Sequence, residues 1–327
     1  MDLGEIRAFL GEDWVKTQNI IADALKSDIE LLDRTNAMIL SHSGKQLRPM
    51  LALLVARACS EESLGKDSHL AAAAAELLHN ATLLHDDVAD ESDKRRGNPT
   101  LNSLMGPSVS VLVGDFWLVK AVDCVLDAAG SGMDVIRIYA STLRHLAEGE
   151  MLQLQKAMSG NTDESDYLRI IYNKTTALFE TSAVAAARSV KAAPELEEGM
   201  KRYAFNLGQA FQIRDDIFDY HLDMNVGKPV GADILERKIT LPLLGAFRNA
   251  GKDAEDRIRK MVTSITSHPE SRDEIVRFVL DNGGLEYAQS RLGDFVDEAV
   301  RALDVLRPSK EKDYLVALAR FVGSRLS

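Results

Sequence analysis

The chain has 327 residues, enough for one large domain or two smaller ones. Its 46% hydrophobic and 27% charged residues are ordinary for a globular protein and exclude a disordered, collagen-like or membrane-embedded chain. The 39 Lys and Arg against 50 Asp and Glu give a net charge of -11, which argues against broad attraction to nucleic acid or anionic lipid.

Several common signals are missing from the sequence. Cys59 and Cys124 have neither CxxC nor Cys/His spacing, so neither a zinc site nor a disulfide framework is expected, and a reducing cytoplasm is the predicted location. The acidic N-terminus does not resemble a signal peptide, and no apolar run is long enough to span a membrane. No GxGxxG, GxxxxGK[ST] or GxSxG motif occurs.

Apolar residues recur at helical spacing along most of the chain, and strand-like alternation is nearly absent. In chain order, helices are predicted over 51–58, 70–84, 109–126, 136–158, 165–190, 195–222, 237–249, 254–266, 271–282, 285–305 and 310–325. The prolines fall at helix starts or connections. Because no linker or repeat is evident, we predict a single all-α domain over residues 1–327.

The segment LLHDDVAD places three carboxylates at the end of a predicted helix. Asp86 and Asp90 are related as i,i+4 and Asp87 and Asp90 as i,i+3, so the three share one face. Like charges repel, and a helix C-terminus is the negative end of the helix dipole. Bound cations would relieve both effects, so the pattern indicates a cation site.

A second acidic segment, RDDIFD, repeats this arrangement with Asp215, Asp216 and Asp219. One such cluster is also typical of a solvated face in an acidic protein. Two clusters, each after an apolar helix, favour paired sites for Mg²⁺, which binds through one or two carboxylates and takes further oxygens from water and phosphate.

Basic residues stand close to both acidic segments or to helix ends, and each alone is typical of a surface charge. Together they favour a diphosphate site, because Lys and Arg bind phosphate oxygens. They are Lys45, Arg48, Lys94, Arg95, Arg96, Lys174, Lys228 and Lys238.

Five motifs, in this order, resemble those of the trans-isoprenyl diphosphate synthase family: GKQLRP, LLHDDVADESDKRRG, NKTT, FQIRDDIFD and GKPVGAD. The resemblance covers roughly residues 44–242. It implies a helical bundle around a deep central cavity, usually in a homodimer. The implied reaction is head-to-tail condensation of isopentenyl diphosphate with an allylic diphosphate such as farnesyl diphosphate.

The resemblance also implies a role for each matching residue. About three Mg²⁺ ions would be held on the allylic diphosphate by Asp86, Asp87, Asp90, Asp215, Asp216 and Asp219. The same diphosphate would be bound by Arg95, Lys174 and Lys238, with Lys228 nearby. Isopentenyl diphosphate would be bound by Lys45, Arg48, His79 and Arg96, and the carbocation would be stabilised by Thr175 and Gln212.

His79 has a second interpretation, because a lone His on an apolar helix is often a core residue. It precedes Asp86 by two helical turns and so lies on the same side of the helix as the carboxylates, which favours substrate binding.

The small residues before the first acidic motif bear on product length. Short-chain members of the family carry aromatic rings where this chain has Ala81 and Thr82. With Leu78 one turn deeper, these positions predict a tunnel for a long-chain polyprenyl product of the kind that supplies quinone side chains. Alternatively, Phe116 or Trp117 on the next helix closes the tunnel and gives a short product.

Three other classes of protein remain. A class I terpene cyclase also ionises a diphosphate with Mg²⁺, but it generally lacks the second substrate's site that Lys45, Arg48 and Arg96 indicate. A non-catalytic partner subunit of a two-component synthase is disfavoured by the intact acidic motifs. A helical interaction protein would carry its Asp clusters only as solvated faces.

Overall fold

The computed structural model describes residues 2–42, 44–95, 97–128, 133–220 and 230–323. The chain divides into two compact units. Unit 1 comprises Met1–Ser141, Leu178–Arg202 and Ala302–Ala317, and unit 2 comprises Thr142–Ala177, Tyr203–Arg301 and Leu318–Ser327. The single domain over residues 1–327 stays a prediction.

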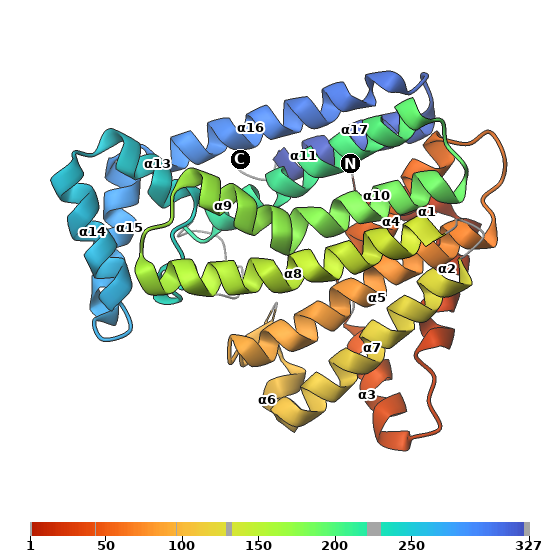
Figure 1. Cartoon of the computed structure of the whole chain (residues 1–327), viewed down its shortest axis with the longest axis horizontal. Coiled ribbons are helices and arrows are strands. Elements are labelled where there is room, and N and C mark those ends of the chain that lie inside the picture. The colour runs from red at the N-terminus through yellow and green to blue at the C-terminus, as the bar shows by residue number, and fades with distance from the viewer. Residues whose placement is uncertain (1, 43, 96, 129–132, 221–229, 324–327) are drawn as a thin grey trace. The chain divides into compact units, whose positions relative to one another are not determined.

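The predicted all-α class is confirmed, since the described residues form helices and one short hairpin of two two-residue strands (Figure 1). Up to the seventh helix, the elements are α1 (Leu3–Leu10), α2 (Glu12–Ala24), α3 (Glu30–Ser41), α4 (Leu47–Ala58), α5 (Lys66–Ala89), β1 (Lys94–Arg95), β2 (Asn98–Pro99), α6 (Leu101–Met105) and α7 (Pro107–Asp127).

The later elements are α8 (Met133–Ser159), α9 (Glu164–Ile171), the π-helical turn η2 (Tyr172–Thr176), α10 (Ala177–Ser189), α11 (Pro194–Phe218), α12 (Ala232–Leu235), α13 (Leu241–Asn249), α14 (Lys252–Ser264), η3 (Pro269–Ser271), α15 (Arg272–Asp281), α16 (Gly284–Ala302), η4 (Leu303–Val305) and α17 (Lys310–Gly323).

Most predicted helices match, with differences at their ends, but the helix predicted over 165–190 is divided into α9 and α10 by the π-helical turn η2. The helix predicted over 237–249 begins only at Leu241, because Thr240 is extended and Pro242 lies in the first turn, where a missing N–H costs nothing. The helix predicted to reach residue 222 ends at Phe218. Helices α1, α2, α3, α6 and α12 have no counterpart among the predicted helices.

Helix α5 carries the first acidic motif and is largely buried in unit 1. Its residues Ala71–Ala75 are at most 3% exposed, and their small side chains let neighbouring helices approach closely. Helix α7 packs beside it, where Ser110 Oγ donates to the Leu84 carbonyl at 2.9 Å. A Cβ at Gly114 would lie 2.4 Å from His85 Nε2, so this glycine allows the His85 ring to lie against α7.

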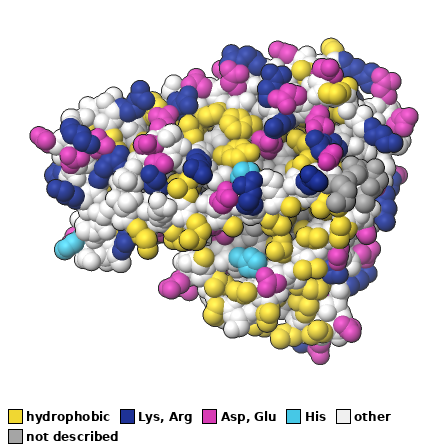
Figure 2. Space-filling model, viewed as in Figure 1, with side chains coloured by type: hydrophobic (Ala, Val, Ile, Leu, Met, Phe, Trp, Pro, Cys, Tyr) yellow, Lys and Arg dark blue, Asp and Glu magenta, His cyan; other side chains and the backbone are white. Residues whose placement is uncertain are grey.

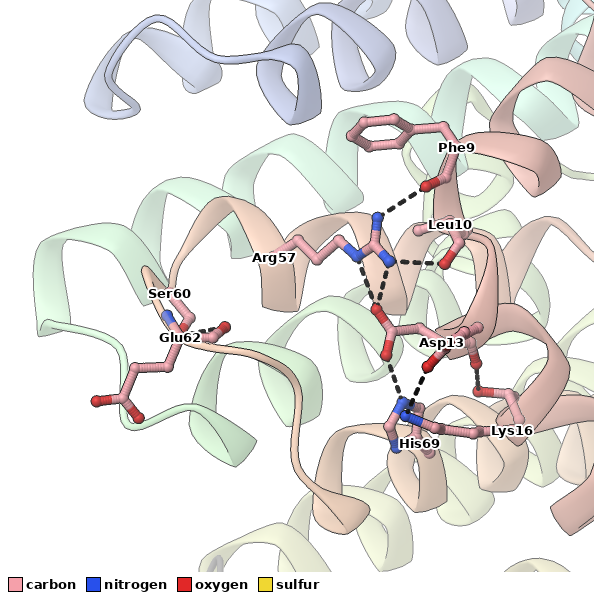
Figure 3. A network of polar contacts seen from close by, with 10 residues as sticks. Phe9, Leu10, Asp13, Lys16, Arg57, Ser60, Glu62 and His69 are labelled. Carbon is pink, nitrogen blue, oxygen red and sulfur yellow. Dashed lines mark hydrogen bonds and ion pairs between the residues drawn. The ribbon is translucent and has the colours of Figure 1, made fainter.

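A buried polar network joins α1 and α2 to α4 and α5 (Figure 3). Asp13 accepts hydrogen bonds from Arg57 Nε and His69 Nε2, both at 2.8 Å. Arg57 also donates to the carbonyls of Phe9 and Leu10, which end α1. At the other end of α4, Arg7 donates to the Lys45 carbonyl at 2.9 Å. Helix α4 is therefore held at both ends by α1 and α2.

In unit 2, the π-helical turn η2 lies between α8 and α11. A Cβ at Gly149 of α8 would lie 2.7 Å from Asn173 Cβ, and one at Gly208 of α11 would lie 2.8 Å from Thr176 Cα. Both glycines thus permit contacts that a larger residue would prevent. Since π-turns interrupt regular helices and are frequent at functional sites, η2 marks a candidate site.

Candidate active site

The three carboxylates of the first motif have different surroundings in unit 1. Asp86 and Asp87 lie in the last turn of α5, and Asp90 is its C-cap. Asp87 is 4% exposed, Asp86 is half-buried and Asp90 is exposed. The predicted helix end is confirmed, and only the outer carboxylates face solvent to any extent.

Arg95 pairs with the buried carboxylate of this motif. The chain turns back after α5 through the β1–β2 hairpin, which places Arg95 opposite Asn98 in the ladder. Arg95 Nε and Nη2 both lie 2.9 Å from Asp87 Oδ1, and Asn102 Nδ2 donates to the Asp87 carbonyl at 3.2 Å. A cation is therefore held beside the acidic motif.

Lys45 and Arg48 flank the start of α4, also in unit 1. Between them, Gln46 is a non-glycine residue in the left-handed region, at φ 51° and ψ 48°. Such a conformation is uncommon outside glycine and persists when the surroundings enforce it. Lys45 is exposed, whereas Arg48 is 7% exposed and its guanidinium lies 4.6 Å from the centre of the Phe179 ring.

The second motif, in unit 2, divides its carboxylates in a similar way. Asp215 is exposed and accepts a hydrogen bond of 3.0 Å from Arg214 Nη2. Asp219 lies just beyond α11, and its two carboxylate oxygens accept from the backbone N–H groups of Ala232 and Asp233. Asp219 thus anchors the start of α12.

Asp216 belongs to a chain of hydrogen bonds inside unit 2. Tyr167 donates to its Oδ2 at 2.6 Å, and Gln212 Nε2 donates to its Oδ1 at 2.8 Å. Thr175 Oγ1 in turn donates to Gln212 Oε1 at 2.8 Å. The chain runs from α9 to α11 and back to η2. It brings together Thr175 and Gln212, which were assigned the same role from the sequence.

Burial governs the acidity of two members of this chain. It raises the pKa of Asp216 well above its usual value, and the charge of Asp233 adds to this, while hydrogen bonds from Tyr167 and Gln212 act in the opposite direction. Burial likewise raises the pKa of Tyr167, and the adjacent Asp216 charge raises it further. Tyr167 therefore remains a neutral hydrogen-bond donor.

The lysines predicted to bind diphosphate in unit 2 are paired with carboxylates. Lys174 Nζ lies 2.6 Å from Glu150 Oε1 and 3.0 Å from Gln153 Oε1, both on α8. Lys238 pairs with Glu236, and its backbone N–H donates to the Asp233 carbonyl. Two further predicted residues, Lys228 and Arg96, lie outside the described residues.

The predicted tunnel residues lie on α5. Ala81 and Leu78 are each 1% exposed, and Thr82 is half-buried. The two aromatic candidates for a floor differ: Trp117 is 1% exposed and donates to Asn36 Oδ1 at 2.8 Å, whereas Phe116 is half-buried with Lys120 Nζ 5.4 Å from its ring centre.

The structure adds residues that the sequence did not single out. Tyr167, Glu150 and Gln153 contact predicted site residues directly. Tyr167 appears in the sequence only as one aromatic residue of an amphipathic helix. Glu150 and Gln153 lie on α8, distant in sequence from Lys174, so no local pattern could connect them.

The carboxylates fit a magnesium site of a particular kind. Among the residues that the structure describes, no group of three or more His, Cys, Asp or Glu is arranged to hold a metal ion. Mg²⁺ needs only one or two protein carboxylates when waters and substrate phosphates supply the other ligands. The exposed carboxylates of Asp90 and Asp215 suit that mode of binding.

Within the ranges that the structure describes, no helix is long and apolar enough to cross a membrane.

Asp-rich helix ends with basic side chains beside them have the chemistry for binding a diphosphate through divalent cations. Comparison with known proteins makes the assignment specific. Residues 29–279 match the family model described as polyprenyl synthetase. The chain belongs to the polyprenyl synthetase family.

Relatives match along nearly the whole chain. An all-trans-nonaprenyl-diphosphate synthase of Rhodobacter capsulatus is 36% identical over 98% of both chains. An octaprenyl diphosphate synthase of Escherichia coli is 36% identical over 99% of both.

Two solved structures share the fold. A decaprenyl diphosphate synthase from Rhodobacter capsulatus has a TM-score of 0.92 at 32% identity and covers 100% of both chains. A polyprenyl synthase from Caulobacter crescentus, solved with calcium and isoprenyl diphosphate, has a TM-score of 0.91 at 30% identity over 100% of this chain and 98% of that one.

Proposed function

We propose that the protein is a Mg²⁺-dependent trans-polyprenyl diphosphate synthase that condenses isopentenyl diphosphate with an allylic diphosphate. Family membership and the full-length similarity to octaprenyl and nonaprenyl synthases support this reaction. The structural observation that carries it is the pair of Asp-rich helix ends, each with an arginine side chain paired to one of its carboxylates. The two motifs lie in different units, so their joint action is inferred from the family and not from their relative positions.

Within the predicted set of six carboxylates, we assign direct metal binding to Asp86, Asp90 and Asp215. Asp215 and Asp90 are exposed and Asp86 is half-buried. Asp215 keeps this exposure although it accepts a hydrogen bond from Arg214. Asp87 and Asp216 are buried and bonded to Arg95 and to Tyr167 and Gln212, and both carboxylate oxygens of Asp219 accept from backbone N–H groups. Bound Mg²⁺ would neutralise charge on the departing diphosphate. About three ions per site are proposed.

The diphosphates would be bound by the cations on either side of the carboxylates. For the allylic substrate these are Arg95, Lys174 and Lys238, with Lys228 in support. For isopentenyl diphosphate they are Lys45, Arg48, His79 and Arg96. Fixed cations in a site closed to water stabilise the diphosphate leaving group more strongly than water does. Ionisation of the allylic C–O bond then leaves a carbocation, and the double bond of isopentenyl diphosphate attacks it.

The carbocation needs lone pairs nearby without a reactive nucleophile. The hydroxyl of Thr175 and the amide of Gln212 provide these in an arrangement fixed by their mutual hydrogen bond. After the new C–C bond forms, a proton leaves the adjacent carbon, and the released diphosphate is a suitable base. No Ser/His/Asp or Cys nucleophile is required for these steps.

A long-chain product is supported by the small residues Ala81 and Thr82 and by the names of the relatives. The buried Leu78 continues the same face of α5. The relatives include octaprenyl, nonaprenyl and solanesyl synthases, although one short-chain isoprenyl diphosphate synthase is 33% identical over 91% of this chain. We propose a product for quinone side chains and an intracellular, cytoplasmic location, in keeping with two free cysteines.

A homodimer is proposed from the outer face of α7. Leu112, Val119, Val122 and Leu126 are 67%, 55%, 40% and 48% exposed and recur at helical spacing along one stripe. Hydrophobic side chains gather over this part of the surface (Figure 2). A contiguous apolar stripe of this length is typical of an interface. A second copy of the chain offers the same stripe, as a two-fold interface requires.

The function is tested by incubating the purified protein with farnesyl diphosphate, isopentenyl diphosphate and Mg²⁺ and measuring product lengths. Chain growth that needs isopentenyl diphosphate and stops with a chelator is expected. A cyclic hydrocarbon would instead indicate a terpene cyclase, and no turnover would indicate a partner subunit. Asp215→Asn should lower kcat on the order of 10²–10³-fold, whereas Asp294→Asn, at an exposed Asp of α16, serves as the matched control.

A further inference from the structure

The hydroxyl of Tyr167 lies at the end of a hydrogen-bonded chain that reaches the proposed carbocation site. Tyr167 is 3% exposed and comes from α9, and Asp216 is 4% exposed and comes from α11. Their hydrogen bond of 2.6 Å is short for a phenol and a carboxyl group. Neither group reaches solvent, so the contact is part of the interior of unit 2.

The chain of hydrogen bonds determines which way the Gln212 amide points. Asp216 Oδ1 accepts from Gln212 Nε2 at 2.8 Å, so the amide nitrogen faces the carboxyl group. Gln212 Oε1 then faces Thr175 and accepts its hydroxyl proton at 2.8 Å. With that proton committed to Gln212, the remaining lone pairs of Thr175 Oγ1 are left as acceptors. Reversal of the amide would place two acceptors against each other at Asp216.

Tyr167 fixes the other oxygen of the same carboxyl group. The Asp216 side chain is thereby held from α9 at Oδ2 and from its own helix at Oδ1. Without the Tyr167 hydroxyl, Oδ2 would be buried without this donor, and rotation of the carboxyl group would release Gln212. Tyr167 and Thr175 also share the continuous stretch from α9 to η2, so both ends of the chain are anchored on one element.

We propose that Tyr167 is a positioning residue for the prenyl transfer step: through Asp216 it orients the Gln212 amide and the Thr175 hydroxyl toward the allylic carbocation. This inference rests on the proposed function. It assigns Asp216 to the support of Gln212 rather than to metal binding.

The protein offers a matched control in Tyr287, which lies outside this series of hydrogen bonds. Its hydroxyl donates to Glu164 Oε2, also at 2.6 Å, and Glu164 is the first residue of the same helix α9. Tyr287→Phe therefore removes one phenol–carboxylate hydrogen bond to α9 without touching Asp216, Gln212 or Thr175. Any general effect of loosening α9 should appear in both variants.

The experiment compares kcat, both KM values and the Mg²⁺ concentration for half-maximal activity in the full-length wild type, Tyr167→Phe and Tyr287→Phe. For Tyr167→Phe we expect kcat to fall on the order of 10-fold, with KM values and Mg²⁺ requirement unchanged. Tyr287→Phe should keep the kcat of the wild type. In a Gln212→Ala background, Tyr167→Phe should cause no further loss of kcat, because its effect passes through Gln212.

Three outcomes would overturn the proposal. Equal kcat in the two Tyr→Phe variants would leave Tyr167 with a structural role only. A raised Mg²⁺ requirement would place Asp216 among the metal ligands. Additive losses with Gln212→Ala would show that Tyr167 acts by another route. Failure of the proposed function itself is distinguishable, because the wild type would then not consume isopentenyl diphosphate at all.

Discussion

Arg95 and Asp87 meet through two nitrogens and one oxygen: Nε and Nη2 of the guanidinium both lie 2.9 Å from Oδ1 of the carboxylate. Asp87 is buried, whereas the Arg95 side chain is 35% exposed. The Arg95 side chain is therefore only partly buried, while its charge compensates the buried carboxylate.

Replacing Arg95 should affect both stability and binding. Arg95→Met leaves the Asp87 carboxylate buried without this donor, which should lower the free energy of unfolding by about 1–3 kcal/mol. It should also raise the Kd of the allylic diphosphate. Urea unfolding and substrate titration measure the two effects. Arg34→Met, which breaks the exposed pair with Glu30, is the control and should change neither the free energy of unfolding nor the Kd. Equal free energies of unfolding for Arg95→Met and the wild type would contradict the compensating role of Arg95.

The close approach of α11 to η2 at Gly208 predicts a second effect. Gly208→Ala would bring its Cβ within 2.8 Å of the Thr176 backbone, and the resulting strain should destabilise the protein by about 1–3 kcal/mol. Because Thr175 is adjacent, kcat should fall as well. Gly293→Ala, at an open helical position, should instead raise stability by about 0.5–1 kcal/mol. If Gly208→Ala and Gly293→Ala had similar free energies of unfolding and similar kcat values, the role of the close approach at Gly208 would be refuted.

The small side chain of Ala81 predicts the effect of a larger one on product length. Ala81→Phe should shift the products to shorter chains, because the ring would narrow the path along α5. Chromatography measures the ratio of shorter to longer products. This ratio does not depend on the amount of active enzyme. Ala81→Ser, which changes size little, should leave the product lengths as in the wild type. An unchanged distribution in Ala81→Phe would remove Ala81 from the tunnel wall.

The network around Asp13 predicts a pH-dependent contribution to stability. Burial raises the pKa of Asp13, but hydrogen bonds from His69 and Arg57 outweigh it, so the folded-state pKa lies below the ordinary 3.8. The contribution is thus present above pH 3.8 and is lost as pH falls through the lower folded-state pKa.

Asp13→Asn should therefore be less stable than the wild type at pH 7 by about 1–3 kcal/mol. The difference should shrink below about pH 4, as measured by urea unfolding across pH. Asp23→Asn, which breaks the exposed pair with Lys26, should show little difference at any pH. If the difference in free energy of unfolding between Asp13→Asn and the wild type stayed constant down to about pH 3, the role of the ionised carboxylate would be contradicted.

The apolar stripe on α7 predicts the oligomeric state. The double variant Leu112→Glu with Val119→Glu should raise the dimer dissociation constant at least about 100-fold, since each buried charge opposes association. Analytical ultracentrifugation measures this. Leu280→Glu, at a partly exposed Leu of α15, should remain a dimer. A dimeric double variant, or a monomeric wild type, would exclude α7 as the interface.

The all-α class, most helix positions and the two acidic motifs could be predicted from the sequence alone. These features depend on local spacing: the 3.6-residue period shows in the apolar pattern, and Asp residues three and four apart must share a helix face. Helices α1–α3 went unpredicted, and the contacts that hold α1 and α2 against α4, such as that of Arg57 with Asp13, join residues far apart along the chain, which no local pattern shows.

The differences among the carboxylates of each motif appear only in the folded structure. In the sequence Asp215, Asp216 and Asp219 are chemically alike, yet one faces solvent, one bonds Tyr167 and Gln212, and one anchors α12. The partners come from residues distant along the chain, such as Tyr167 on α9. Burial and hydrogen bonding between such residues follow from packing, which no local pattern encodes.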